Sequence, residues 1–360
     1  MSFEIPISIP KMTSLEREYL LKAFDSGWLT QNGEAVFEME SNIKLHINRN
    51  SILKPKEVTS CSNGSTALHL ALLSLDLGPQ DEVIVPNFSY IAPVNAVLLS
   101  GATPKILDID PNSWCLSESN IEKNISENTK AIISVDNYGN VPEMTSIREK
   151  FPEIVIIQDA AESFPGVNTK ENYYGDIITF SFYANKIFTS GEGGAIAGSP
   201  EVIERVKYLK NQNVERKGEF KHRDIGFNYR ITNLQAAIFN AQWNRRDQIM
   251  SKRMEIFSNY EKILNLNPLV HNANFNANPW LVTIELVNGY STKIREKFTE
   301  NRIETRPGFT PLSKHPWVVK KSMIEEQIIH SVNLSQNIIS LPTFEDLDKR
   351  SIEKICKVLE

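Results

Sequence analysis

Hydrophobic and polar positions follow two different spacings along the chain. Near the N-terminus the apolar residues recur every three or four positions, which is typical of helices that bury one face. Thr13 and Glu16 have the spacing of a capping box, so we expect a helix that runs through Phe24. A second helix is predicted after residues 26–34.

From Ser60 onwards, short apolar segments alternate with helical ones. The segments are rich in β-branched residues, which suits strands that are buried on both faces. They span residues 82–86, 103–109, 130–138 and 153–159. Strands that are separated by helices predict a mostly parallel sheet in an α/β domain.

Two helices in this part of the chain have clear end signals. The apolar segment 66–78 ends at Gly78, which suits a helix C-cap. A later helix is predicted to begin after Ser199 as N-cap, with Pro200 at its first position. The glycines of residues 191–198 suit a tight turn and a return strand.

The composition changes after about Arg245. A helix over 246–264 leads into an Asn-rich loop, a strand is expected within 279–286, and further helices follow. A chain of this length suits a large domain plus a smaller one. We therefore assign the N-terminal helices and a large α/β domain to residues 1–244, and a small α+β domain to residues 245–360.

The composition of the chain argues against several classes of protein. The 360 residues carry a net charge of −5 with both signs interspersed, so no surface for nucleic acid or membrane is predicted. No apolar segment approaches the length of a membrane span, and no signal peptide is evident. Cys61, Cys115 and Cys356 lie far apart, so neither a disulfide framework nor a metal site is expected. A cytoplasmic location fits this cysteine usage.

The first candidate for chemistry is the segment Asn63, Gly64, Ser65 and Thr66, which precedes a strongly apolar helix. A helix N-terminus offers free backbone N–H groups and suits a phosphate. Ser and Thr are also ordinary N-cap residues, and the segment taken alone favours a simple cap over a phosphate site. The P-loop pattern is absent, because no Gly-Lys-Ser/Thr follows.

Asp159 and Lys186 are the other candidates. Asp159 ends a predicted strand, and Lys186 follows the next one, at 177–183. Ligands bind at the carboxyl edge of such sheets, so the two side chains should meet there. Asp159 could instead be a helix N-cap, and Lys186 a surface lysine with its amine in water. The apolar and glycine-rich segments that flank Lys186 do not resemble a solvated face.

Taken in order, these signals resemble pyridoxal phosphate enzymes with the aspartate-aminotransferase fold (fold type I). More specifically, the chain resembles the sugar aminotransferases of the DegT/DnrJ/StrS family. The resemblance covers nearly the whole chain. It rests on residues 26–34, 62–72, 81–110, 159–166, 180–186, 191–198, 225–242, 302–313 and 340–347.

The resemblance implies a role for each matching residue. Lys186 would hold pyridoxal phosphate in a Schiff base, with pyridoxamine phosphate as the form that carries the amino group. Asp159 would pair with the pyridine nitrogen, Tyr90 would stack on the ring, and Glu162 would lie by the 3-hydroxyl group. These roles make chemical sense, since the ring acts as an electron sink only while it stays cationic.

The resemblance also implies a homodimer with shared active sites. The phosphate would be bound by Gly64, Ser65, Thr66 and Ser181. Asn228 would complete this phosphate site from the other chain. Thr30 and Arg306 would contact the substrate.

Some positions depart from the usual pattern. Asp136 and Ser313 stand where a histidine is common. Glu162, Asn185 and Arg306 resemble the perosamine synthases of the family. The resemblance therefore implies amination at C4 of a nucleotide-linked 4-keto-6-deoxyhexose, with glutamate as donor, for O-antigen or a related glycan.

Three alternatives stay open at this point. One is a C3 aminotransferase that acts on a 3-keto nucleotide sugar. Another is a sugar dehydratase of the same family, although that branch carries histidine at the position of Lys186. The third is a protein with this fold that has no catalytic activity.

Overall fold

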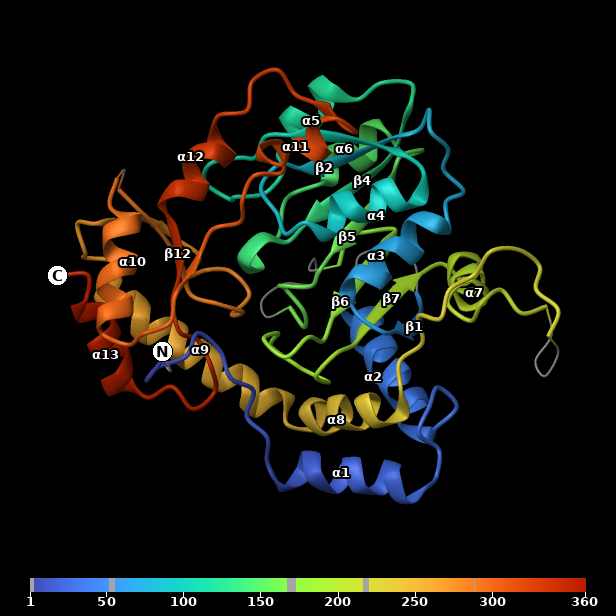
Figure 1. Cartoon of the computed structure of the whole chain (residues 1–360), viewed down its shortest axis with the longest axis horizontal. Coiled ribbons are helices and arrows are strands. Elements are labelled where there is room, and N and C mark those ends of the chain that lie inside the picture. The colour runs from blue at the N-terminus through green and yellow to red at the C-terminus, as the bar shows by residue number, and fades with distance from the viewer. Residues whose placement is uncertain (1–2, 52–55, 167–172, 216–219, 288) are drawn as a thin grey trace.

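The computed structural model describes residues 3–51, 56–166, 173–215, 220–287 and 289–360. Within these residues a large sheet has the strand order β1-β7-β6-β5-β4-β2-β3-β11, and a small sheet has the order β10-β12-β9-β8 (Figure 1). The large sheet comprises β1 (Glu57–Cys61), β2 (Glu82–Pro86), β3 (Thr103–Leu107), β4 (Thr129–Val135), β5 (Val155–Asp159), β6 (Ile177–Ser181), β7 (Gly194–Gly198) and β11 (Met323–Ile324).

The large sheet is mostly parallel, which confirms the predicted α/β class. Strands β2 to β6 and β11 pair in parallel, and only β7 runs antiparallel to its neighbours β1 and β6. Val135 at the end of β4 is in register with Asp159, which is in turn opposite Thr179 of β6. The carboxyl ends of β4, β5 and β6 therefore meet at one edge of the sheet.

Helices cover the faces of this sheet. They are α3 (Gly64–Leu73), α4 (Ala92–Ser100), α5 (Glu118–Asn124), α6 (Thr145–Lys150) and α7 (Pro200–Leu209). The predicted start of α7, with Ser199 as N-cap, is confirmed.

The prediction that the first of these helices extends to Gly78 is wrong. Helix α3 ends at Leu73, and Ser74 at the C-cap donates a side-chain hydrogen bond of 2.6 Å back to the carbonyl oxygen of Ala71. Asp76 then adopts a left-handed φ of +58°, which ends the helical path. The backbone at Asp76, and not the hydrophobic pattern, therefore sets the end of the helix.

The N-terminal helices pack on α8 (Asn233–Asn244), beside the large sheet. They are α1 (Ser14–Asp25) and α2 (Glu34–Asn50), and α1 runs alongside α8 at the bottom of Figure 1. The predicted capping box of Thr13 and Glu16 is present at the start of α1.

The remaining elements lie toward the C-terminus. Helix α9 (Arg246–Leu264) has the bounds that the sequence predicts. The others are β8 (Val270–Ala273), β9 (Thr283–Leu286), α10 (Ser291–Glu300), β10 (Arg306–Pro307), α11 (Pro316–Val319), α12 (His330–Asn337), β12 (Ile338–Ser340) and α13 (Lys349–Lys357). Strand β11 leaves this region and pairs with β3 of the large sheet. The division at residue 244 thus stays a prediction, and the C-terminal part contributes to both sheets.

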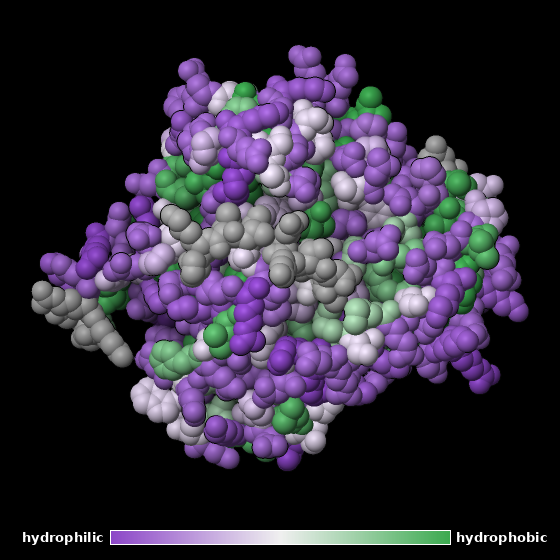
Figure 2. Space-filling model, turned by 180° about the vertical axis from the view of Figure 1, so that it is seen from behind, coloured by the Kyte–Doolittle hydropathy of each residue, from purple (hydrophilic) through white to green (hydrophobic). Residues whose placement is uncertain are grey.

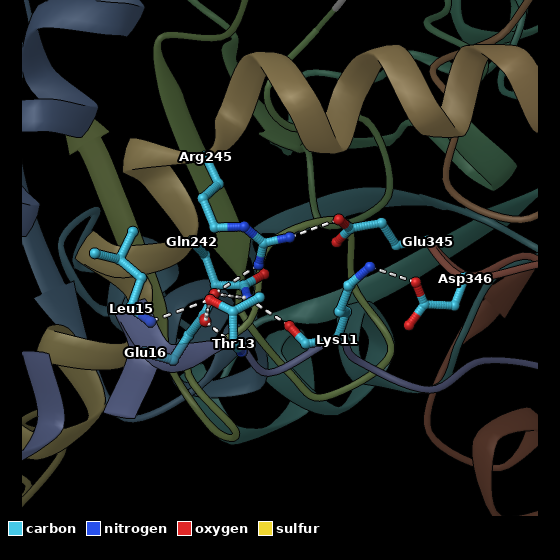
Figure 3. Close-up of polar contacts among 8 residues, drawn as sticks. All are labelled: Lys11, Thr13, Leu15, Glu16, Gln242, Arg245, Glu345 and Asp346. Atoms are coloured by element: carbon cyan, nitrogen blue, oxygen red, sulfur yellow. Dashed lines mark hydrogen bonds and ion pairs between the residues drawn. The ribbon is translucent and has the colours of Figure 1, made fainter. Parts of the chain in front are cut away.

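An ion-pair cluster fastens the N-terminus to the C-terminal part (Figure 3). Arg245, at the junction of α8 and α9, pairs with Glu16 at 2.8 Å and with Glu345 at 2.5 Å. All three side chains are at most 9% exposed. Gln242 donates a further hydrogen bond to Glu16, and Lys11 pairs with Asp346 nearby. Buried charges of this kind are stable only while every partner remains in place.

The surface seen from behind is mostly hydrophilic, and its hydrophobic residues form small, separate patches (Figure 2). None of the helices in the described part of the chain is long and apolar enough to span a membrane.

Candidate active site

A cavity of about 690 Å³ opens at the carboxyl edge of the large sheet. It is lined by residues from the strand ends, from the start of α3 and from β9 and β10 regions of the small sheet. They are Asn63, Gly64, Ser65, Leu68, Tyr90, Ala92, Pro93, Val135, Asn137, Asp159, Ala161, Glu162, Ser181, Tyr183, Asn185, Lys186, Glu192, Trp280, Arg306, Pro307 and Phe309. Eight of the eleven residues to which the resemblance assigns a role therefore meet in one place.

The start of α3 forms one end of the cavity. Gly64 approaches Ser181 of β6 so closely that a Cβ atom at position 64 would lie 2.7 Å from the Ser181 Cβ. The first N–H groups of a helix lack partners within the helix, so this end of the cavity suits an anion. Thr66 does not line the cavity, since its hydroxyl group and backbone form a capping box with Asn63. The predicted cap is thus confirmed for Asn63 and Thr66, and phosphate binding by Gly64 and Ser65 stays a prediction.

Asp159 lies at the end of β5 and is 8% exposed. One carboxylate oxygen accepts a hydrogen bond of 3.2 Å from the backbone N–H of Ala161. Burial raises the pKa of Asp159 to about 6, although this N–H group and the charge of Lys186 oppose the rise. A cation placed against this carboxylate would lower the pKa of Asp159 toward its ordinary value.

Lys186 lines the same cavity as Asp159 and follows the turn after β6. Its backbone N–H donates to the carbonyl oxygen of Tyr183 at 2.9 Å, and its Nζ lies 3.4 Å from Oε1 of Glu162. The other oxygen of Glu162 accepts from the backbone N–H of Tyr138 at 2.8 Å. Burial raises the pKa of Glu162, while Lys186 lowers it. The lysine amine and two carboxyl groups thus share one buried space.

Aromatic and cationic residues surround the mouth of the cavity. The Tyr90 ring is 61% exposed and its centroid lies 6.3 Å from that of Phe309. Arg306 lies on β10, within the same lining. Thr30 and Asn228 do not line the cavity of their own chain, and both are exposed.

Asp136 lies next to the site but does not line it. Its carboxylate accepts hydrogen bonds from the Gln158 amide at 2.9 Å, the Ser163 hydroxyl at 2.5 Å and the Tyr174 hydroxyl at 3.3 Å. Complete burial raises the pKa of Asp136 to about 8. Ser313, the second departure, also lies outside the lining, and its backbone N–H donates to Asn87.

Sequence reasoning misses several lining residues, above all Trp280, Phe309 and Asn137. Asn137 is fully buried and donates to the carbonyl oxygens of Phe88 and Trp114, at 2.7 and 2.9 Å. Trp280 comes from the segment before β9, more than ninety positions after Lys186. Its proximity follows from the packing of the C-terminal part, which no local pattern reveals.

Comparison with known proteins decides the family. The sequence matches the DegT/DnrJ/EryC1/StrS aminotransferase family over residues 10–360. The chain belongs to this family. It is 36% identical to the GDP-perosamine synthase of Escherichia coli O157:H7, over 98% of this chain and 97% of that protein.

Solved structures of two other enzymes have the same fold. The chain matches Helicobacter pylori PseC, an aminotransferase of pseudaminic acid biosynthesis, with a TM-score of 0.90, 22% identity and coverage of 100% of this chain and 98% of the other. It also matches the Escherichia coli GDP-4-keto-6-deoxy-D-mannose-3-dehydratase with a TM-score of 0.90, 20% identity and full coverage of both chains. The predicted fold type I architecture is thereby confirmed.

Proposed function

We propose that this family member is a pyridoxal phosphate-dependent aminotransferase that converts a GDP-linked 4-keto-6-deoxyhexose to the 4-amino sugar, with glutamate as amino donor. The observation that carries the proposal is the meeting of Lys186, Asp159 and Glu162 in one cavity. The similarity to a GDP-perosamine synthase indicates the nucleotide and the carbon. A role in O-antigen or related glycan synthesis, in the cytoplasm, goes with this proposal.

The residues present fit pyridoxal phosphate. Gly64 leaves a space beside Ser181 that any side chain would fill, as a closely held phosphate requires. The raised pKa of Asp159 shows a buried carboxyl that a ring cation would complement. When bound, the cofactor supplies an electron sink for the carbon that gains or loses the amino group.

Each residue then has a distinct task. Lys186 would hold the cofactor covalently, and its amine, when free, would carry the proton to and from the reacting carbon. Asp159 would keep the ring nitrogen protonated, since a preorganised charge in a dry site is far more effective than one in water. Glu162 holds the Lys186 amine at 3.4 Å. Gly64, Ser65 and Ser181, which line the cavity, would anchor the phosphate.

The main alternative is the dehydratase reaction. Fold similarity alone does not separate the two activities, because the dehydratase matches the chain as closely as PseC does. The family resemblance associates that branch with histidine at position 186, where this chain has lysine. A free amine at this position favours amino transfer.

A homodimer with shared sites belongs to the same proposal. Asn228 and Thr30 are exposed and lie outside the cavity of their own chain. This placement leaves both available to a second copy. Asn228 would then complete the phosphate site of the partner subunit.

Incubation with a panel of nucleotide sugars tests the function. The protein would receive pyridoxal phosphate, [15N]glutamate and either 4-keto or 3-keto sugars linked to GDP, UDP or TDP, and mass spectrometry would follow the product. We expect a 15N-containing amino sugar from the GDP-linked 4-keto compound. Loss of a hydroxyl without nitrogen uptake would indicate the dehydratase, and labelling of only a 3-keto sugar would indicate the C3 enzyme.

A further inference from the structure

One contact to the catalytic lysine has no task in the proposed function. The Nζ atom of Lys186 lies 4.1 Å from the centroid of the Trp280 ring. The indole Nε1 of Trp280 donates a hydrogen bond of 2.8 Å to the backbone carbonyl oxygen of Asn185. A single side chain therefore contacts both the amine of the lysine and the peptide bond that precedes it.

Trp280 is itself held firmly. Arg253 of α9, which is 5% exposed, donates hydrogen bonds to the carbonyl oxygens of Trp280 at 2.7 Å and of Pro279 at 3.3 Å. The ring of Tyr138 stacks on Trp280 at an interplanar angle of 21°. Trp280 is consequently 4% exposed and restrained at its backbone and at its ring.

The burial of Arg253 is costly. Among the ion pairs of the described residues none includes Arg253, and burial lowers its pKa to about 10. The charge of Glu345 opposes this fall in pKa, but a guanidinium group without a direct ion pair gains less than one paired with a carboxylate. Its hydrogen bonds go to the backbone of Pro279 and Trp280. We therefore attribute the cost of burying Arg253 to holding Trp280 in place.

The contact has a clear consequence for the lysine. An ammonium group within about 6 Å of an aromatic centroid is attracted to the ring face. Glu162 provides the second contact, at 3.4 Å. A lysine side chain is flexible, and misplacement of a reacting group by about 1 Å can slow a reaction ~100-fold. Two fixed contacts define where the free amine rests.

We propose that Trp280 is a positioning residue for Lys186. Its ring face holds the amine in the place from which it must act after release from the cofactor, and its N–H group fixes the turn at Asn185. Arg253 connects helix α9 to this turn, because it donates hydrogen bonds to the segment that carries Trp280. The inference rests on the proposed role of Lys186, but it concerns the resting place of the amine and not the choice of sugar.

The test measures the amine directly in the cofactor-free protein. Formaldehyde and cyanoborohydride methylate lysines, and peptide mass spectrometry gives the rate at Lys186. We expect Trp280→Leu to raise this rate about fivefold, the factor expected when one cation–π contact is lost. Trp280→Phe keeps an aromatic face, so its labelling should stay near the wild-type rate.

Two further variants separate positioning from simple opening of the cavity. Arg253→Met leaves the indole in place but releases its backbone, and we expect it to raise the labelling rate as well. Trp243→Leu is the matched control, because Trp243 is equally buried, at 5%, and has no contact with Lys186 among the ring and cation contacts of the described residues. This control should label Lys186 at the wild-type rate.

Steady-state kinetics supply a second measurement with the loaded enzyme. Trp280→Phe loses the hydrogen bond to Asn185, so kcat should fall about tenfold while KM for the sugar changes less than twofold. Labelling and kcat that match the Trp243→Leu control in both Trp280 variants would overturn the inference. Failure of the wild-type protein to transfer nitrogen would instead contradict the proposed function, and the labelling rates would still decide the role of Trp280.

Discussion

At the scale of single residues, the carboxyl group of Asp136 gives the clearest pH dependence. Its folded-state pKa of about 8 lies above the ordinary value for aspartic acid, so the folded protein binds this proton more tightly than the unfolded chain does. The contribution of Asp136 to stability is therefore largest at low pH and decreases as the pH rises from about 4 to about 8.

The variant Asp136→Asn removes this titration. Its amide oxygen can accept from Gln158 and Ser163, and its NH2 group can donate to the Tyr174 hydroxyl oxygen. We expect the Tm of the cofactor-free variant, relative to wild type, to be higher at pH 9 than at pH 5. Thermal unfolding by circular dichroism at the two pH values measures this. An equal difference at both would show that Asp136 does not titrate in this window.

The residues that could be found from the sequence share one property. Asp159, Ser181 and Lys186 lie at or after the ends of apolar segments, and the carboxyl edge of a parallel sheet brings such positions together. Trp280 and Phe309 lack this property, because their place depends on how the C-terminal part packs over the sheet. The assigned chemical roles remain predictions, since they concern a bound cofactor.

At the scale of elements, the approach of α3 to β6 limits the space at the end of the cavity where we propose that the phosphate binds. Gly64→Ala would place a Cβ atom 2.7 Å from that of Ser181, so the helix start or the strand end must shift. Overpacking of this kind costs about 1–3 kcal/mol. If the cost falls on cofactor binding, Kd for pyridoxal phosphate should rise about 10- to 100-fold.

Fluorescence or absorbance titration of the cofactor-free protein measures this change. Gly78→Ala is the matched control, because its Cβ atom would meet nothing closer than 3.8 Å and the residue lies outside the site. Unchanged affinity in Gly64→Ala would show that the phosphate does not bind against this helix.

The same element shows why helix ends are hard to predict. Apolar residues continue past Leu73 to Leu77, and a glycine follows, so the hydrophobic pattern suggests a longer helix. The structure ends it where the Ser74 hydroxyl bonds back to Ala71. Asp76 then turns the chain away with a left-handed φ, whereas no residue of helix α9 has a left-handed φ, and the predicted bounds of α9 are confirmed.

At the scale of the whole molecule, the question is whether one chain contains a complete site. We would mix the inactive variant Lys186→Ala with the weakened variant Asn228→Ala and allow subunits to exchange. In a shared site, each mixed dimer regains one site with both native residues, so about a quarter of all sites should become active at equal mixing.

Activity of the mixture is compared with that of each variant alone and with a mixture of Asn228→Ala and wild type. A self-contained site would give no gain above the residual rate of Asn228→Ala. A fully active wild-type protein that is monomeric in analytical ultracentrifugation would equally contradict a shared site.

The covalent attachment of pyridoxal phosphate to Lys186 is the central claim, and chemical trapping tests it most directly. The loaded protein would be reduced with borohydride, digested and mapped by mass spectrometry. We expect a pyridoxyl group on the peptide that contains Lys186, and its absence from that peptide in Lys186→Ala. A pyridoxyl group on any other lysine, or none on a protein that transfers nitrogen, would contradict the account.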